Sequence, residues 1–336
     1  MVDTVLVTGG AGFVGSHVVV ELGRNGYAPV VLDNFSNSTP AIRPRLEALA
    51  GRPVPCVTAD VRDIAALRNA FHDHPIAAVV HCAGLKNVAE SEARPLAYYD
   101  VNVGVTLALV EVMGEAGVGT LVFCSAASVY GNVADGAATE DTPREPVSVY
   151  ARTKRVVEDF LRDLHRANPN WRIAALRKGN VAGAHASGMM GEAPRGSPSH
   201  LLPQLCRVAA GDASEVVVNG DDWDTRDGTT LRDYVHVQDL ADAFVRTLRH
   251  VAREPKFVEV NAGGGAAHSV LDVIAAFERA CGRSLGRTIG PRRAGDIARS
   301  SVDIARAAAL VGWKPTRDLD AICADAWRWQ KNGARY

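Results

Sequence analysis

The sequence predicts an α/β protein built on a doubly wound parallel sheet, and three observations lead to this prediction. Short runs rich in β-branched residues alternate with stretches of helical period through the first 180 residues, which is the order of strands and helices in a parallel sheet. A glycine-rich turn joins the first of these runs to the first helix. Polar residues follow several of the strands, at the edge where ligands bind in such sheets.

The predicted elements follow one another along the chain. Strands are expected at 4–8, 29–32, 54–58, 77–81, 121–125 and 171–177. Helices are expected at 16–22, 64–71, 95–116, 148–165 and 235–251. Beyond residue 180 the chain is looser, with a loop rich in Gly, Pro and Ser over 188–203. Such a loop is typical of a segment that covers a ligand, so a smaller mixed α/β C-terminal domain is expected to form the substrate side.

The composition excludes several classes of protein. The chain has 336 residues, 47% hydrophobic and 22% charged, as in an ordinary globular protein. Its formal net charge of −1 provides no field to recruit nucleic acid or an anionic membrane. No apolar run is judged long enough to span a membrane, and the chain enters a strand without a signal peptide, so a cytoplasmic location is expected. Scattered cysteines with no close pair indicate reduced thiols and no metal site: Cys56, Cys82, Cys124, Cys206, Cys281 and Cys323.

The first turn predicts a binding site for a dinucleotide. Gly9, Gly12 and Gly15 lie between a strand and a helix, where glycine allows a tight turn and lets backbone N–H groups approach a pyrophosphate. Asp33 ends the next strand, where a carboxylate binds both hydroxyls of an adenosine ribose and repels a 2′-phosphate. Asp60 follows the third strand, within reach of an adenine amino group. The pattern indicates a Rossmann-type unit and favours NAD over NADP; the alternative is a glycine turn that binds nothing.

A tyrosine and a lysine one helical turn apart predict a proton-abstracting pair. Tyr150 and Lys154 share one face of a helix. Tyrosine ionises near pH 10, and a neighbouring ammonium favours the phenolate, so the pair can take a proton from a hydroxyl. At this spacing alone, a half-buried ring beside a solvated charge is the more common arrangement. The position of the pair after five alternating strands favours the catalytic interpretation.

Motifs along nearly the whole chain resemble one family. They are Thr-Gly-Gly-x-Gly-Phe-x-Gly at 8–15, Asp33-Asn34, Asp60-Val61, His81-x-Ala-Gly-Leu-Lys86, Val129-Tyr130-Gly131, Tyr150-x-x-x-Lys154, Gly-Ala-His-Ala-Ser-Gly at 183–188, Leu-Arg-Asp-Tyr-Val-His-Val at 231–237, and Arg292-Arg293-x-Gly-Asp296. In this order the motifs resemble the extended short-chain dehydrogenases/reductases, and more narrowly the UDP-galactose (UDP-glucose) 4-epimerases. That family holds NAD tightly.

The resemblance implies an NAD-dependent epimerase of a nucleotide-linked sugar. Such an enzyme inverts a hydroxyl carbon, here most simply C4, through a transient keto intermediate. Tyr150 would take the hydroxyl proton, while Lys154 would hold the nicotinamide ribose and lower the tyrosine pKa. The implied cofactor-binding residues are Gly9, Gly12, Phe13, Val14, Gly15, Asp33, Asn34, Asn37, Ser38, Asp60, Val61, Cys82, Ala83, Gly84, Lys86, Asn102, Tyr150 and Lys154.

The resemblance also implies a substrate side, a domain division and a homodimer. Residues 1–180, joined by about 232–255, would form the NAD-binding domain, and 181–336 the substrate lobe. The helices 95–116 and 148–165 would pair across a dimer as a four-helix bundle; alternatively, both simply cover the sheet. An arginine alone is more often a surface charge, but the family match favours a role in binding diphosphate. The implied substrate-binding residues are Lys86, Ser125, Ala126, Ser128, Tyr150, Lys178, Asn180, His200, Leu201, Asn219, Arg232, Arg293, Asp296 and Ser300.

The sequence leaves the family pattern on the substrate side. The family's catalytic serine or threonine falls on Ala126, which has no hydroxyl. The segment 177–180 reads Arg-Lys-Gly-Asn in place of Arg-Tyr-Phe-Asn. A loop asparagine becomes His200, the ring that stacks on uracil becomes Asn219, and a position that is a large aromatic in some members is Ser300.

Two interpretations of these departures stay open. In the first, the protein is a standard epimerase in which Ser125 or Ser128 supplies the lost hydroxyl. In the second, which the clustering favours, the substrate is a nucleotide- or nucleoside-linked sugar with a bulkier or acidic group, such as a uronic acid, facing Lys178.

Two other functions are compatible with the fold, a dehydratase and a regulator that binds NAD. A dehydratase of the same fold needs an Asp-Glu pair where Ala126-Ala127 stands, which disfavours it. A non-catalytic NAD-binding regulator agrees with the lost serine, but the retained Tyr150 and Lys154 oppose it.

Overall fold

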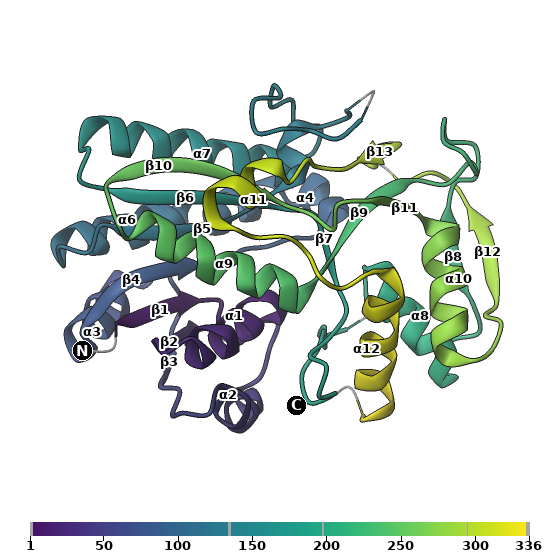
Figure 1. The fold of residues 1–336 in the computed structure, drawn as a ribbon, viewed down its shortest axis with the longest axis horizontal. Helices are drawn as coiled ribbons and strands as arrows, with labels where there is room; N and C mark the ends of the chain where they lie inside the picture. Colours follow the sequence, from purple (N-terminus) through teal and green to yellow (C-terminus); the bar gives the residue numbers. More distant parts are fainter. Residues whose placement is uncertain (1–2, 134–135, 197, 294, 334–336) are drawn as a thin grey trace.

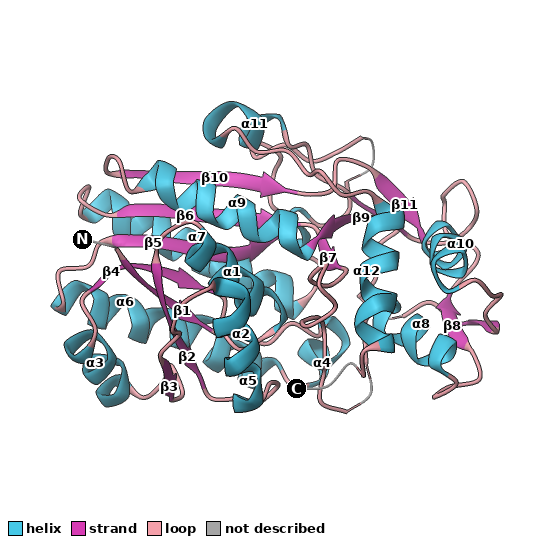
Figure 2. Ribbon diagram, turned by 60° about the horizontal axis from the view of Figure 1, so that its bottom comes forward, coloured by secondary structure: helices cyan, strands magenta, loops and turns pink. Residues whose placement is uncertain are grey.

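The computed structural model describes residues 3–133, 136–196, 198–293 and 295–333, and its largest feature is a sheet of seven strands (Figures 1 and 2). The strand order is β10-β6-β5-β4-β1-β2-β3, and every pairing along it is parallel. The predicted doubly wound sheet is therefore confirmed. Its strands are β1 (Thr4–Thr8), β2 (Ala28–Asp33), β3 (Cys56–Thr58), β4 (Ile76–His81), β5 (Thr120–Ala126), β6 (Arg172–Lys178) and β10 (Lys256–Ala262).

Helices cover both faces of this sheet, because each crossover between parallel strands places a helix on one side or the other. The first face carries α1 (Phe13–Arg24), α2 (Arg43–Ala50) and α9 (Val237–Val251). The second face carries α3 (Ile64–Asp73), α6 (Val105–Glu115) and α7 (Val149–Ala167). Shorter pieces between them are η1 (Pro40–Ile42), α4 (Val88–Ala93) and η3 (Ala127–Tyr130).

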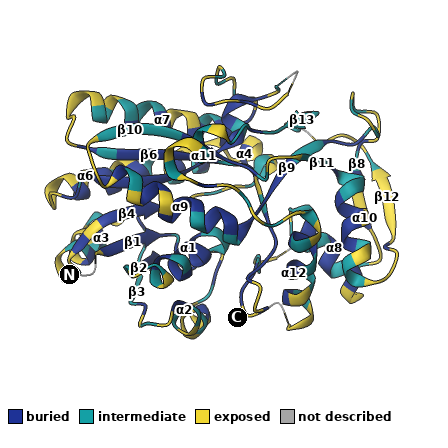
Figure 3. Ribbon diagram, in the orientation of Figure 1, coloured by how far each residue is buried: buried dark blue, intermediate teal, exposed yellow. Residues whose placement is uncertain are grey.

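Side chains of the central strands alternate between these two layers of helices, as the period of a strand requires. Cys124 and Leu176 pack with the first layer, whereas Phe123 and Ala175 pack with the second. Both layers are apolar, which explains why the strands are buried along most of their length (Figure 3). The same alternation decides which polar residues at the strand ends reach a ligand.

The helix expected at 95–116 is present but is not uniform. It consists of α5 (Pro95–Tyr99), a π-helical turn η2 (Asp100–Gly104) and α6. Among the described residues, Pro95–Glu115 is the one helix that is long and apolar enough to cross a membrane by length and composition. Its mean hydropathy is 1.3, and 44% of its most apolar 18-residue window is buried. The expectation that no run reaches that length is therefore wrong by this criterion.

Two details of the second half differ from the predicted elements. The helix expected at 235–251 begins at Val237, because Val235 and His236 end the strand β9 (Leu231–His236). The His236 side chain caps that helix by accepting a hydrogen bond from the backbone N–H of Gln238. The seventh strand of the large sheet, β10, was not among the predicted strands, and it pairs with β6 over its whole length.

A smaller lobe lies beside the carboxyl ends of the strands (Figure 1). Its strands form a four-stranded sheet around β9 and a two-stranded pair, β8 with β12. Its helices α8, α10 and α12 pack together around a third apolar cluster. The remaining elements are β7 (Asn180–Ala182), α8 (Leu201–Ala210), β8 (Val216–Asn219), β11 (Ala267–Ser269), α10 (Val270–Cys281), β12 (Arg287–Gly290), β13 (Arg299–Ser300), α11 (Ala305–Val311) and α12 (Leu319–Lys331).

Candidate active site

A cavity of about 1360 Å³ runs from the strand ends of the large sheet into the smaller lobe. A pocket for one drug-sized ligand is roughly 300–1000 Å³, so this cavity has room for two ligands placed end to end. The glycine turn, Asp33 and Asp60 line one part of it, and Arg232 and Arg293 line another. Between these parts lie Tyr150 and the ends of β5 and β6.

The glycine turn forms a cradle that side chains would fill. Gly9 has a φ of +67°, and a Cβ there would lie 2.7 Å from the backbone nitrogen of Ala83. A Cβ on Gly15 would lie 2.2 Å from the carbonyl oxygen of Gly9. Gly12 is the N-cap of α1 and offers no side chain to cap the first-turn N–H groups, which leaves that helix end suited to an anion. Phe13 and Val14 also line this part of the cavity.

Asp33 is held in one orientation by the surrounding backbone. Its Oδ2 accepts from the N–H of Ala11 (3.0 Å), and its Oδ1 accepts from the N–H of Phe35 (2.8 Å) and the hydroxyl of Ser38 (3.2 Å). The side chain is buried yet lines the cavity. A fixed carboxylate at the end of β2 suits a ribose with two free hydroxyls better than one bearing a phosphate.

The residues after β2 and β3 are linked to one another. Asn34 donates to Oδ2 of Asp60 (2.9 Å), and the Arg62 guanidinium pairs with the same carboxylate (2.8 Å). The hydrogen bond from Arg62 holds the pKa of Asp60 well below its usual range. Asn37 and Val61 complete this wall of the cavity.

The predicted pair Tyr150 and Lys154 lies in the middle of the cavity, at the start of α7. The Ser148 hydroxyl caps this helix by accepting from the N–H of Ala151. Lys154 Nζ donates to the carbonyl oxygen of Cys124 (3.0 Å) and lies 6.0 Å from the centre of the Tyr150 ring. The pair is thus anchored to β5 through its lysine.

Two opposing effects act on the Tyr150 phenol. Burial raises its pKa, and the positive charge of Lys154 lowers it; burial prevails, so the pKa lies above its ordinary value. The expectation of a lowered pKa from the lysine alone is wrong for the protein by itself, because that expectation left out desolvation.

Asn102 acts behind the cavity wall and does not line it. Its Oδ1 accepts from the N–H of Leu85 (2.8 Å), while its Nδ2 donates to the carbonyl oxygen of Leu85 and to Thr153 Oγ1. These bonds fix the segment from Cys82 to Lys86, whose residues do line the cavity. Asn102 thus supports a loop of the cavity wall, and its contact with a cofactor stays a prediction.

The structure separates the two candidate serines. Ser125 is fully buried, points to the second layer of helices and donates to Glu158 Oε1, so its predicted role as the substitute hydroxyl is wrong. Ala126 and Ser128 line the cavity. The Ser128 hydroxyl is buried and has no hydrogen-bond partner in the described part of the chain. A buried hydroxyl without a partner is uncommon, and this one is suited to bind a ligand oxygen.

Cys82 and Cys124 form a pair that the sequence spacing did not indicate. His81 pairs with Phe123 in the register of β4 and β5, so the next residues, Cys82 and Cys124, are neighbours at the strand ends. The hydrogen bond from the Cys82 thiol, with the charges of Lys178 and Lys154, lowers the pKa of Cys124 below its ordinary value against the effect of burial. Both are free thiols, as are the other four cysteines.

The predicted substrate residues converge on the far part of the cavity. An arginine pair shares one carboxylate there: Asp296 Oδ1 lies 2.8 Å from Arg293 Nη2 and 3.7 Å from Arg232 Nη2. Burial lowers the pKa of Arg232. The other predicted residues that line the cavity are Lys86, Lys178, Asn180, His200, Leu201, Asn219 and Ser300.

Glu192 joins this site, although no sequence argument identified it. Its Oε1 lies 2.8 Å from Lys86 Nζ and 2.8 Å from His200 Nδ1. Burial raises the pKa of Glu192, but Lys86 and His200 outweigh burial and lower the pKa to about 2. The ion pair ties the loop 188–203 to the large domain. The only sequence signal was an acidic residue inside a loop expected to cover a ligand.

Lys178 differs from the three cations of the cavity that pair with a carboxylate. Lys86, Arg232 and Arg293 each face a carboxylate. Within the ranges that the structure describes, the Lys178 side chain makes no hydrogen bond or ion pair with another residue, and it lines the cavity near Cys124. Its charge is therefore available to a ligand.

Such a fold and cavity define a dinucleotide-dependent enzyme that acts on a hydroxyl carbon. The chain belongs to the NAD dependent epimerase/dehydratase family, whose sequence profile matches residues 5–263. This agrees with the family resemblance of the motifs.

Within this family, the chain is similar to UDP-glucose 4-epimerases. The chain is 45% identical to a UDP-glucose 4-epimerase of Neisseria meningitidis serogroup B, covering 98% of this chain and 97% of that protein. It is similar to the crystal structure of a Bifidobacterium longum UDP-glucose 4-epimerase in complex with NAD+ and UDP (TM-score 0.97, 43% identity, 99% of each chain). A Stenotrophomonas maltophila UDP-glucose 4-epimerase with bound NAD and formylated UDP-arabinopyranose is also similar (TM-score 0.96, 43% identity, 99% of each chain).

Proposed function

We propose that this protein is an NAD-dependent 4-epimerase of a nucleotide-linked sugar, and thus an isomerase. The observation that carries the proposal is the single cavity in which Tyr150 and Lys154 lie between a glycine cradle and the arginine pair. The cradle and the fixed Asp33 carboxylate suit NAD, whose chemistry when bound is to accept a hydride and return it. The relatives named as UDP-glucose 4-epimerases support the same function.

The residues of this chain would transfer the proton and hold the substrate. Tyr150 takes the proton of the C4 hydroxyl on its phenolic oxygen and later gives it back. Lys154 favours the phenolate by its charge. Arg232 and Arg293 hold the diphosphate, since arginine offers a planar fork of donors. A firmly held nucleotide and a loosely held sugar let the 4-keto sugar turn over, so that the hydride returns to the opposite face.

Ser128 would supply the hydroxyl that Ala126 lacks. Its oxygen is buried without a partner and lines the cavity, and a serine there can donate to the sugar oxygen. Ser128→Ala should therefore lower kcat by about 10-fold or more, whereas restoration of a hydroxyl by Ala126→Ser should raise it. Unchanged kcat in Ser128→Ala would remove this role.

A sugar with an acidic group is the second candidate substrate, and Lys178 is the observation that favours it. An unpaired ammonium in a cavity attracts an anion and is costly to bury without one. NMR of the protein with UDP-, dTDP-, GDP- and CDP-sugars, neutral and acidic, identifies the sugar whose C4 configuration exchanges. Lys178→Met should then weaken turnover of the acidic sugar and leave a neutral sugar nearly unaffected; equal effects on both would contradict the acidic preference.

We further propose that the protein is a cytoplasmic homodimer formed through α5, α6 and α7. Large apolar side chains are exposed on these helices, with Leu96 at 83% and Leu107 at 44% exposure. Exposed apolar patches on helices are typical of contacts between subunits. Light scattering coupled to gel filtration measures the assembly directly.

A regulator that binds NAD without turnover is the main alternative. Addition of a sugar nucleotide to the NAD-loaded protein should produce the near-ultraviolet absorbance of reduced nicotinamide, and Tyr150→Phe should abolish it. A regulator would produce none in either protein.

A further inference from the structure

The helix that carries Tyr150 and Lys154 also carries a buried carboxylate on the same face. Glu158 follows Lys154 by four residues, as Lys154 follows Tyr150, so the three side chains form one row along α7. Glu158 is 0% exposed. A buried carboxylate is tolerated only when it is paired and hydrogen-bonded, so the partners of Glu158 determine how α7 sits on the sheet.

Arg177, at the end of β6, is the main partner. Its Nε lies 3.1 Å from Glu158 Oε1 and its Nη2 lies 2.7 Å from Oε2. The remaining donors bind the Tyr130 hydroxyl (2.8 Å), the Glu140 carbonyl oxygen (3.2 Å) and the Glu259 carboxylate (2.5 Å). All five N–H groups of the guanidinium thus have acceptors. Saturation of this kind fixes the orientation of a side chain.

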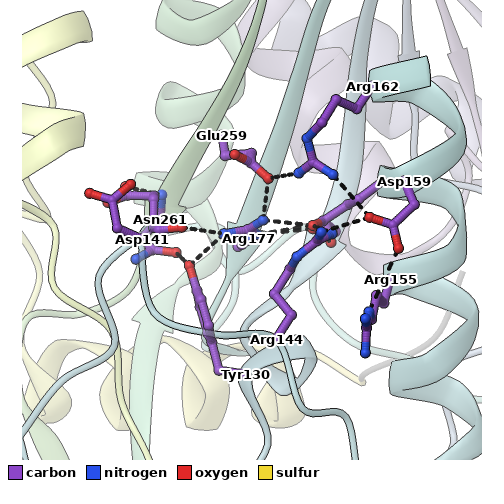
Figure 4. A network of polar contacts seen from close by, with 12 residues as sticks. Tyr130, Asp141, Arg144, Arg155, Asp159, Arg162, Arg177, Glu259 and Asn261 are labelled. Carbon is purple, nitrogen blue, oxygen red and sulfur yellow. Dashed lines mark hydrogen bonds and ion pairs between the residues drawn. The ribbon is translucent and has the colours of Figure 1, made fainter. Parts of the chain in front are cut away.

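Further contacts connect this pair to its surroundings (Figure 4). Arg144 donates to Glu158 Oε2 (3.2 Å) and to Asp159 (2.6 Å), and Arg162 donates to Asp159 (2.9 Å) and to Glu259 on β10. Ser125 donates to Glu158 from β5. The network therefore joins α7 to β5, β6 and β10, and the ends of β5 and β6 line the cavity.

The other end of α7 is held separately. The backbone N–H of Val149 donates to Glu92, and that of Tyr150 donates to the Ser91 hydroxyl (3.1 Å). Loss of the Glu158 contacts would therefore leave the start of the helix attached and allow its body to pivot. Lys154 lies between the two anchors, and its Nζ is held by the carbonyl oxygen of Cys124 on β5. A pivot of the helix away from the sheet would break this hydrogen bond and free the ammonium to leave the Tyr150 phenol.

We propose that Glu158 and Arg177 are positioning residues that hold Tyr150 and Lys154 against the ends of β5 and β6, an inference that rests on the proposed function. Neither residue lines the cavity, so the pair acts through the placement of α7. A misplacement of catalytic groups by about 1 Å can cost on the order of 100-fold in rate. Ser125 belongs to the same device, which explains why a strand-end serine serves Glu158 and not the substrate.

The test replaces the whole pair, because removal of one partner would leave the other charge buried and alone. The double variant Glu158→Leu/Arg177→Met should fold, since apolar residues of similar volume commonly substitute for a buried pair. We expect the thermal midpoint and NAD content of the wild type, a KM within about twofold, and a kcat lower by about 10-fold or more. The matched control is Arg68→Met/Glu115→Leu, which removes an exposed pair (2.6 Å) between α3 and α6 and should leave kcat unchanged.

A second readout needs no substrate. The Tyr150 phenolate absorbs in the ultraviolet, and its absorbance is the difference between each protein and its Tyr150→Phe counterpart. This absorbance should appear at higher pH in the double variant, because Lys154 no longer lowers the pKa of Tyr150 as strongly. A folded double variant with wild-type kcat and wild-type phenolate titration would overturn the proposal. A wild type that epimerises no sugar would instead refute the proposed function and leave the phenolate comparison intact.

Ser125→Ala keeps the proposal testable if the double variant does not fold. It removes one donor to Glu158 and no charge. We expect kcat to fall by about three- to tenfold with the phenolate titration shifted to higher pH. No change in either measurement would overturn the positioning role.

Discussion

Replacement of Gly15 by alanine tests the dinucleotide cradle directly. A Cβ at this position would lie 2.2 Å from the carbonyl oxygen of Gly9 and 2.9 Å from the Cα of Gly10. An ordinary carbon–oxygen contact is about 3.2 Å or longer, so α1 and the turn must separate by about 1 Å. Backbone N–H groups that reach a pyrophosphate at about 2.9 Å would then lie near 3.9 Å, beyond hydrogen-bond distance.

The loss of affinity follows from these displaced donors. A hydrogen bond to a charged group contributes about 1.5–3 kcal/mol, and loss of two of them gives about 3–6 kcal/mol. Since about 1.4 kcal/mol corresponds to a factor of ten, the affinity for NAD should fall by roughly 10²- to 10⁴-fold.

The assay compares Gly15→Ala with a glycine that has free space. Gly114 lies in α6, and a Cβ there would meet nothing within 4 Å, so Gly114→Ala should raise the stability by up to about 1 kcal/mol and leave NAD binding unchanged. Calorimetric titration of NAD gives both affinities, and circular dichroism verifies folding. A folded Gly15→Ala protein that binds NAD within about threefold of the wild type would refute the cradle.

Three further predictions follow from the site. Asp33→Asn removes a charge that repels a 2′-phosphate, so the ratio of NADP to NAD affinity should rise by about tenfold or more; an unchanged ratio in competition titrations would contradict the role of this carboxylate. The Glu192 carboxyl has a pKa of about 2 in the folded protein, against an ordinary value of 4.5. Its contribution to the free energy of unfolding, on the order of 3 kcal/mol, is therefore complete above pH 4.5 and is lost as the pH falls toward 2. Unfolding free energies of the wild type and Glu192→Gln should therefore converge as the pH falls from about 5 to about 2, and a constant difference would contradict this. If the proposed dimer forms through α5 and α6, Leu96→Glu with Leu107→Glu should give a monomer in light scattering, and a dimer that survives both changes would exclude these helices as its interface.

Much of the first domain was predictable because it depends on local pattern. The strand–glycine–helix order and Asp33 fix where a dinucleotide would lie without any knowledge of tertiary contacts. The spacing of Tyr150 and Lys154 fixes their common helix face. Strand alternation could also have shown that Ser125 does not replace the hydroxyl missing at Ala126, since it places these two residues on opposite faces of β5.

The features that the sequence did not reveal share one physical cause, which is that each depends on contacts between residues distant along the chain. The contact of Glu192 with Lys86 depends on how the two lobes meet, and the closeness of Cys82 and Cys124 depends on the register of β4 against β5. The raised pKa of Tyr150 depends on burial by the completed fold. None of these is visible in the spacing of residues along the chain.

The measurement that tests the central claim most directly is epimerisation in heavy water. The NAD-loaded protein is incubated with UDP-galactose and with the other sugar nucleotides in D2O, and the C4 position is followed by NMR. If a hydride leaves and returns within one cavity, the configuration at C4 inverts for at least one sugar and no solvent deuterium enters C4. Deuterium at C4 would contradict hydride return, and retention of configuration in every sugar nucleotide tested would contradict the assignment as an epimerase.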